Sequence, residues 1–312
     1  MKTTVKLLSL ASLMLILCGL VLVSYQHAPE NGFHLDDEPN ITRHAPIRMD
    51  DFSLENIANA ARNGHLEERP ISNVTFAVDW WRGGGSARPF QWTNIALHCL
   101  TAITVMLLIA SVLQVGGKSR ESSIWLAAFF AAALWAVHPI QVQGVTYIVQ
   151  RMAMLAALFS MASVFFYIKG RTAGIVSARW TFYALVVFSA LLGAFSKENA
   201  WIIPALILLA EYGVIRNGQR LLSHRWDYIV IGLPVGLALF VLIDLIFIEG
   251  PVFNYFSRPF SVRDFTLHER LLTQPRVIFF HLSQILWPLP GRFSIEHDFV
   301  TSTSILKPFS TL

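Results

Sequence analysis

The chain has 312 residues, of which 54% are hydrophobic and 14% are charged, and its mean hydropathy is +0.52. This composition excludes an ordinary soluble domain, in which about a quarter of the residues are charged, and it indicates an integral membrane protein surrounded by membrane lipids. The net charge of +4 does not indicate nucleic-acid binding. The Lys and Arg residues lie in short loops between apolar segments, where the positive-inside rule explains them.

The first apolar segment runs from Leu7 to Tyr25 without a charged residue, which is enough to cross a bilayer core of about 30 Å. No small-x-small cleavage site follows it, so we interpret it as an uncleaved span rather than a signal peptide. Lys2 and Lys6 precede it, which places the N-terminus in the cytoplasm.

Six further apolar segments predict spans at about 92–113, 123–138, 152–168, 180–195, 200–214 and 228–248. The connections 114–122, 169–179 and 215–227 are basic, as cytoplasmic loops are. The fold class that we predict is all-α: a polytopic membrane helical bundle of about seven spans, forming a single membrane module over residues 1–312.

Two long loops lie on the opposite, extracytoplasmic face. The first, 26–91, is acidic, and within it Ser53 is placed to cap a short helix over Leu54–Arg62. The second, 249–304, contains the apolar stretch Val277–Leu289, which is short for a span and ends in prolines. We interpret that stretch as an interfacial or re-entrant helix.

The acidic pair Asp36 and Asp37 stands in the first loop, just outside the first span. Two adjacent carboxylates at one substrate titrate as a coupled pair, and one of them can act as a general base toward a hydroxyl. The alternative is that both acids are simply solvated or cap a turn.

Several charged residues fall on the same predicted face as the acidic pair. Arg151 at a membrane boundary needs a partner, and a lipid phosphate is one, although snorkelling to the interface is an equal alternative. Lys197 either joins it or forms a structural pair with Glu198. The predicted donor-binding residues are His138, Arg151, Lys197 and Arg69, with Glu198, His297 and Asp298 as additional candidates. No metal site is visible.

Taken in order, six tracts resemble the multispan GT-C glycosyltransferases. They are 33–41, 68–81, 90–102, 138–159, 196–212 and 270–299. The resemblance is to the family of transmembrane proteins with C-terminal tetratricopeptide repeats that includes the animal TMTC protein O-mannosyltransferases. The animal proteins typically have an acid where Gln143 stands and a Gly-Arg-Ala-Asp-like run where this chain has residues 150–153. The sequence of these tracts therefore resembles the bacterial branch of the family more closely.

The resemblance implies a transferase without a cofactor that moves a sugar from a polyprenyl-phosphate donor to an acceptor hydroxyl of a protein or glycan, most simply a protein Ser or Thr. Asp36 then aligns with the first acid of the family motif and Asp37 with the second. It also implies a bacterial inner membrane with the active site on the periplasmic side, and further spans and tetratricopeptide repeats beyond Leu312. Two rivals stay open: a non-catalytic membrane scaffold for the repeats, and a transporter or lipid flippase.

Overall fold

The computed structural model describes residues 2–117, 120–216, 263–294 and 299–308, with Gly250, Asn254, Ser257, Phe260 and His297. The chain divides into two compact units, Met1–Asn217 and Gly218–Leu312, and each is described by itself. Helices form the regular secondary structure of the described residues, which confirms the predicted all-α class.

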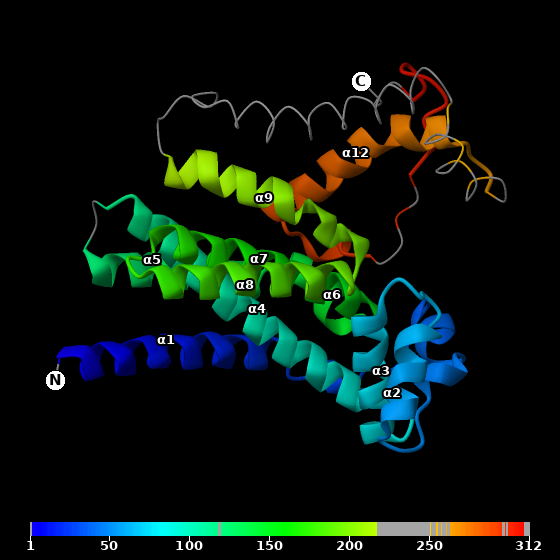
Figure 1. Cartoon of the computed structure of the whole chain (residues 1–312). Coiled ribbons are helices and arrows are strands. Elements are labelled where there is room, and N and C mark those ends of the chain that lie inside the picture. The colour runs from blue at the N-terminus through cyan, green and yellow to red at the C-terminus, as the bar shows by residue number, and fades with distance from the viewer. Residues whose placement is uncertain are drawn as a thin grey trace. The chain divides into compact units, whose positions relative to one another are not determined.

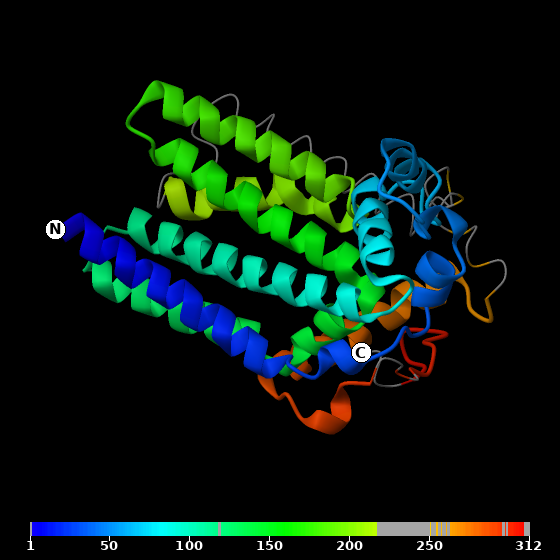
Figure 2. The ribbon, with the colours of Figure 1, turned by 90° about the horizontal axis from the view of Figure 1, so that it is seen from below.

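The first unit is a bundle of long helices with smaller helices gathered at one end (Figure 1). Its helices are α1 (Lys2–Ser24), α2 (Leu54–Arg62), α3 (Pro70–Gly83), α4 (Arg88–Val115), α5 (Glu121–Ala136), α6 (Val142–Thr146), α7 (Arg151–Thr172), α8 (Val176–Ala194) and α9 (Ile203–Ala210). Seen from below, α1, α4, α7 and α8 lie side by side in that order (Figure 2). The small helices α2 and α3 lie at the end opposite the N-terminus of α1.

Four described segments are long and apolar enough to cross a membrane: Arg88–Val115, Ile148–Thr172, Val176–Ala194 and Glu198–Ile215. A fifth span results if α5 and the segment Pro139–Thr146, bent by 55°, are counted together. The bend falls at Pro139, which lacks the N–H that would continue the helix. In α1 the apolar part, Leu10–Ser24, is shorter, and the predicted span 228–248 lies outside the described residues. The structure therefore supports four or five of the seven predicted spans.

Small residues let the long helices pack closely. Ala102 of α4 and Ala128 and Ala132 of α5 are fully buried in one hydrophobic cluster with α1, as is typical of helix contacts in membranes. At Gly170 of α7, an added Cβ would lie 2.8 Å from the ring of Tyr183 in α8. A larger residue there would push the two helices of this hairpin apart.

The first loop folds into a small helical cap on the end of the bundle. Its helix α2 has the predicted bounds, and the Ser53 Oγ accepts a hydrogen bond of 3.2 Å from the Asn56 N–H, as predicted. A second hydrophobic cluster joins this cap to the connection before α7, with Phe76 and Phe90 packed together with Ile148. The cap is therefore held to the bundle by a core of its own.

In the second unit the described residues form one long helix, α12 (Leu267–Leu286). A capping box of Thr266 and Glu269 starts it, so it begins well before the predicted Val277. The first half of α12 is polar, and the helix is not among the segments apolar enough to span.

Candidate functional site

Asp37 anchors the acidic tract to the bundle. Its carboxylate is fully buried and accepts hydrogen bonds from the backbone N–H of His34, at 2.9 Å, and from that of Val149, at 2.7 Å. Since Val149 lies two residues before α7, Asp37 ties the first loop to a segment 112 positions away. Asp37 is therefore placed to position the loop.

Burial of the carboxyl raises the pKa of Asp37 above its ordinary value, with the neighbouring Asp36 acting in the same direction. The two backbone N–H groups and His34 act the other way, because they stabilise the anion. Removing this buried carboxylate would destabilise the fold, because its two N–H donors would be left without a partner.

Asp36 is held differently. Its backbone N–H donates to the Tyr147 hydroxyl at 2.9 Å and its carbonyl accepts from the Asn40 amide at 2.8 Å, while the residue itself is exposed. The backbone is thus fixed on both sides, and the exposed carboxylate lies beside the Tyr147 hydroxyl. Of the two acids, Asp36 is the one accessible to a substrate.

Leu35, directly before the pair, has a φ of +45°. Among the residues that the structure describes, it is the one non-glycine residue with a positive φ, a conformation that a Leu rarely adopts. Such strain persists where the surrounding contacts impose it, and it concentrates at functional sites. The strained turn is consistent with a loop shaped to present Asp36.

Arg151, the first residue of α7, is fully buried. Its Nη2 lies 2.7 Å from Asp79 Oδ2, and its Nε donates to the Asn94 side chain at 2.7 Å. Its Nη1 and Nη2 donate to the carbonyls of Thr75 and Phe90, at 3.0 and 2.9 Å. With all three nitrogens engaged, the guanidinium joins α3, α4 and α7, and we assign it a structural role in place of the predicted phosphate contact.

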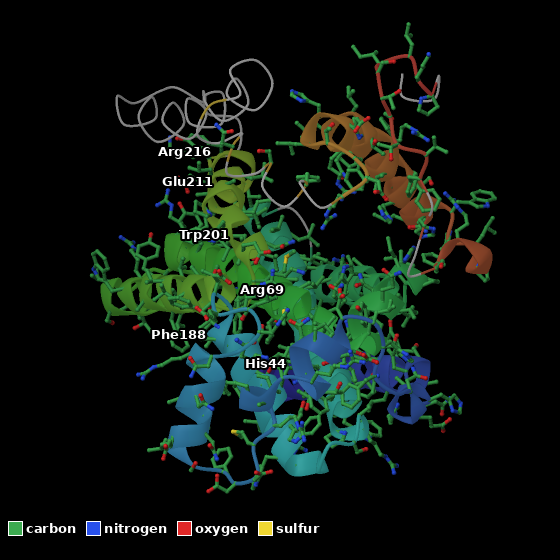
Figure 3. The ribbon with its side chains drawn as sticks, turned by 90° about the vertical axis from the view of Figure 1, so that its right-hand side faces the viewer. His44, Arg69, Phe188, Trp201, Glu211 and Arg216 are labelled. Atoms are coloured by element: carbon green, nitrogen blue, oxygen red, sulfur yellow. The ribbon has the colours of Figure 1, made fainter. Side chains whose placement is uncertain are left out.

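Arg69 and Lys197 form the cationic part of the site. The Arg69 guanidinium makes a two-point contact with the Glu198 carboxylate, at 2.7 and 3.0 Å, and its Nη1 lies 3.1 Å from the Met152 sulfur. Figure 3 shows Arg69 where the first loop meets the long helices. The Lys197 ammonium is half-buried beside this pair, and within the described ranges it has no hydrogen bond or ion pair.

The first loop also joins the turn that carries Lys197. The backbone N–H of Ile71 donates to the Phe195 carbonyl at 3.1 Å, and the Ser72 hydroxyl donates to the Ser196 carbonyl at 2.9 Å. Asp37 and Arg69 contact residues 149 and 152, which are three positions apart at the start of α7. The structure thus brings loop 26–91, connection 138–151 and turn 196–199 together at one end of the bundle.

Burial lowers the pKa of Lys197, with the Arg69 charge acting in the same direction and the Glu198 charge opposing it. A lowered pKa leaves more of the side-chain amine neutral at a given pH. We therefore expect Lys197 to be acylated at a lower pH than a lysine side chain that is free in solution. Arg69→Gln should move the pH midpoint of labelling up, and Glu198→Gln should move it down. Peptide mass spectrometry across a pH series measures this, and equal midpoints in both variants would contradict the placement of Lys197.

The remaining predicted site residues are less informative. His138 is half-buried, and its Nδ1 accepts from the Ile140 N–H at 3.2 Å, which caps the turn before α6. In the second unit the ring of His297 packs edge-on against Phe280, with ring centroids 4.8 Å apart. Asp298 lies outside the described residues, so the roles of His297 and Asp298 stay predictions.

Two important residues were not predicted. Asp79 holds Arg151 and also accepts from Thr93 and Arg82, and Tyr147 holds the backbone of Asp36. Asp79 carried a usable signal, because a lone acid in the apolar run around residues 76–81 requires a buried partner. Tyr147 carried none, since its contact depends on the folded position of the loop.

The described residues contain no group of three or more His, Cys, Asp or Glu side chains arranged to hold a metal ion. What the geometry does provide is an exposed carboxylate, an anchored second carboxylate, and two cations, at one end of a bundle of apolar helices. This defines an integral membrane protein with a charged polar site at the end of its helices.

Among known proteins, this chain is similar to protein O-mannosyl-transferases. It is 28% identical to protein O-mannosyl-transferase Tmtc2 of Drosophila melanogaster over 88% of this chain and 29% of the relative. It is 26% identical to protein O-mannosyl-transferase F38B6.6 of Caenorhabditis elegans over 60% of this chain and 26% of the relative. It is 25% identical to human protein O-mannosyl-transferase TMTC1 over 65% of this chain and 24% of the relative.

The chain therefore spans less than a third of the length of these curated relatives. No protein-family model matches it, and no solved structure matches it.

Proposed function

We propose that this chain is the membrane part of a glycosyltransferase, which transfers a hexosyl group from a polyprenyl-phosphate donor to a hydroxyl of a protein Ser or Thr. The observation that carries the proposal is the docking of the acidic loop: Asp36 is exposed beside the start of α7, where Arg69 also makes contact. The printed names of the similar proteins support the same reaction class.

In the proposed reaction, the acceptor oxygen attacks the anomeric carbon and the bond from that carbon to the phosphate oxygen breaks. Asp36 takes the proton of the acceptor hydroxyl, and the polyprenyl phosphate leaves with the bonding pair. Asp37 does not touch the substrate in this scheme; it holds the loop that carries Asp36. A positioned base opposite a departing group is also the arrangement of inverting glycosidases.

Lys197 and Arg69 bind the phosphate and stabilise the charge that grows on it as the bond breaks. Lys197 is the more available of the two, because Glu198 occupies two N–H groups of Arg69. The Glu198 carboxylate occupies the position on the Arg69 guanidinium that the donor phosphate would take in this scheme. Donor binding therefore replaces this carboxylate with the phosphate.

This exchange predicts opposite effects of two substitutions on donor affinity. Arg69→Gln should weaken binding of a polyprenyl-phosphate donor by about tenfold, the loss of one charge-assisted contact. Glu198→Gln should strengthen it several-fold, because the competing carboxylate is gone. The Glu198 side chain is 59% exposed and stays solvated when the pair is broken, so either change should alter stability by only about 1 kcal/mol or less. Titration of donor into purified protein in lipid nanodiscs measures both affinities, and a weaker Glu198→Gln complex would contradict the exchange.

We further propose that the N-terminus is cytoplasmic and that the site faces the periplasm of a bacterial inner membrane. The end of the bundle away from the site is basic: Glu211 there pairs with Arg171 and Arg216, and Figure 3 shows Glu211 and Arg216 on one helix. This matches the positive-inside rule.

The direct test of the function is sugar transfer by the purified chain. The chain in nanodiscs is incubated with a polyprenyl-phosphate mannose donor and a Ser/Thr-rich peptide, and hexosylated peptide is measured by mass spectrometry. Transfer that depends on Asp36 supports the proposal. A chain that neither binds nor turns over the donor would instead be a membrane scaffold.

A further inference from the structure

A small pocket of about 160 Å³ lies inside the first unit, between α4, α5, α6 and the start of α7. Its walls include His98, Thr101, Trp135, Gln141, Gln150 and Ala153. No residue of the reaction scheme above lines it, so it is a site beyond the acids and cations already described.

The size of the pocket limits its occupant. An engineered cavity of about 150 Å³ accepts a single benzene ring, whereas pockets for drug-sized ligands hold about 300 Å³ or more. The pocket therefore has room for one six-membered ring, and a longer ligand would extend out of it.

The lining determines the chemistry of that ring. Gln141 and Gln150 are half-buried, and neither side-chain amide has a hydrogen-bond partner in the part of the chain that the structure describes. Each amide offers two donors and one acceptor group, and polar groups in an otherwise apolar pocket fix the orientation of a polar ligand. An apolar ring would leave both amides unsatisfied, at a cost in affinity.

The pocket also has a preformed aromatic wall. The His98 Nε2 lies 2.8 Å from the Ala136 carbonyl, which fixes the imidazole, and the ring centroids of His98 and Trp135 are 5.2 Å apart. The indole is held in place by this contact and half-exposed toward the pocket. A flat apolar wall faced by amides suits a monosaccharide, which has an apolar C–H face and hydroxyls around its rim.

The pocket adjoins the acidic loop through Tyr147. The Gln150 N–H donates to the Tyr147 carbonyl at 3.0 Å, and the hydroxyl of the same tyrosine accepts from Asp36. We propose that this pocket receives the sugar ring of the lipid-linked donor, with the Trp135 ring against its C–H face and the amides of Gln141 and Gln150 on its hydroxyls. The proposal rests on the proposed function and adds to it the sugar subsite.

The test compares two lipids that differ only in the sugar: a polyprenyl-phosphate mannose and the same polyprenyl phosphate without it. Affinities are measured for the full chain in nanodiscs. Gln141→Leu and Gln150→Leu should each weaken binding of the sugar-bearing lipid by about tenfold and leave binding of the sugar-free lipid unchanged. Ala153→Leu, which fills the pocket, should act in the same direction. Val142→Ala, at an exposed position in the same tract that does not line the pocket, is the control and should change neither affinity.

The outcomes separate the two proposals. If the parent chain binds both lipids but the pocket variants leave both affinities unchanged, the sugar subsite is overturned while the transferase proposal stands. If the pocket variants weaken both lipids equally, the pocket holds part of the lipid and the sugar subsite is again overturned. If the parent chain binds neither lipid, the proposed function fails and the subsite fails with it. Thermal melting of each variant shows whether a loss of binding comes from unfolding.

Discussion

Arg151→Ala is expected to cost the fold about 3–5 kcal/mol, the range for breaking a buried ion pair by removing one partner. The buried carboxylate of Asp79 would lose its charge partner at 2.7 Å. The Asn94 side chain and two backbone carbonyls would lose hydrogen bonds as well. The fraction of protein that stays folded in detergent, followed as the temperature rises, measures the effect.

Arg82 supplies a matched control, because it pairs with the same carboxylate at 3.1 Å while its side chain is 53% exposed. Arg82→Ala should cost about 1 kcal/mol or less, as solvated pairs do. If Arg151→Ala melts like the parent, the structural role is wrong and the phosphate contact regains support. Because Arg151 and Asp79 are in contact, the double variant with Asp79→Asn should cost less than the sum of the single variants.

Asp36→Asn is expected to lower sugar transfer by about 10²–10⁴-fold, the contribution of a positioned general base. The amide cannot take the acceptor proton at neutral pH. Folding should be little affected, because the substitution keeps the backbone contacts of this residue. The amide oxygen of an Asn can also still accept from the Tyr147 hydroxyl beside it. Transfer rates with saturating donor, and melting of the same sample, measure the two effects separately.

Asp37→Asn gives the contrasting result. An Asn side chain has one acceptor oxygen, so it cannot accept from both His34 and Val149 as Asp37 does. We expect a loss of about 1–3 kcal/mol in the stability of the loop, together with a reduced rate. A variant at Asp37 that is inactive yet fully stable, alongside an active Asp36→Asn, would reverse the roles of the two acids.

The local features of the fold could be predicted from the sequence. The spans predicted at 92–113 and 180–195 correspond to α4 and α8 within a few residues, because a run of apolar residues of spanning length has few alternatives. The cap at Ser53 was predictable for the same reason, since both partners lie within one turn of helix. The bend after α5 was not anticipated, although Pro139 is visible in the sequence.

The candidate site was only partly predictable. Its three segments were correctly grouped on one face, because charge asymmetry orders the loops without knowledge of contacts. What each charged residue does depends on partners far away in the chain. Arg151 resembles a phosphate ligand until Asp79 is seen beside it, and Arg69 resembles a free cation until Glu198 is seen. From the sequence alone, an arginine that is buried in an ion pair cannot be distinguished from one that is free to bind a ligand.

The contacts of the first loop also fix the order in which this protein can be assembled. Asp37 needs a backbone group 112 residues further on, and Ser72 needs one 124 residues further on. The loop is synthesised early, but the partner of Asp37 exists only after α4, α5 and α6 have been made, and the partner of Ser72 only after α8. Contacts so distant in sequence form late, because the intervening chain must first be ordered. The acidic pair therefore reaches its folded geometry only after α4 and α5 and the connection before α7 have been made, and a chain stalled before that point carries the acids without the geometry that the proposed activity needs.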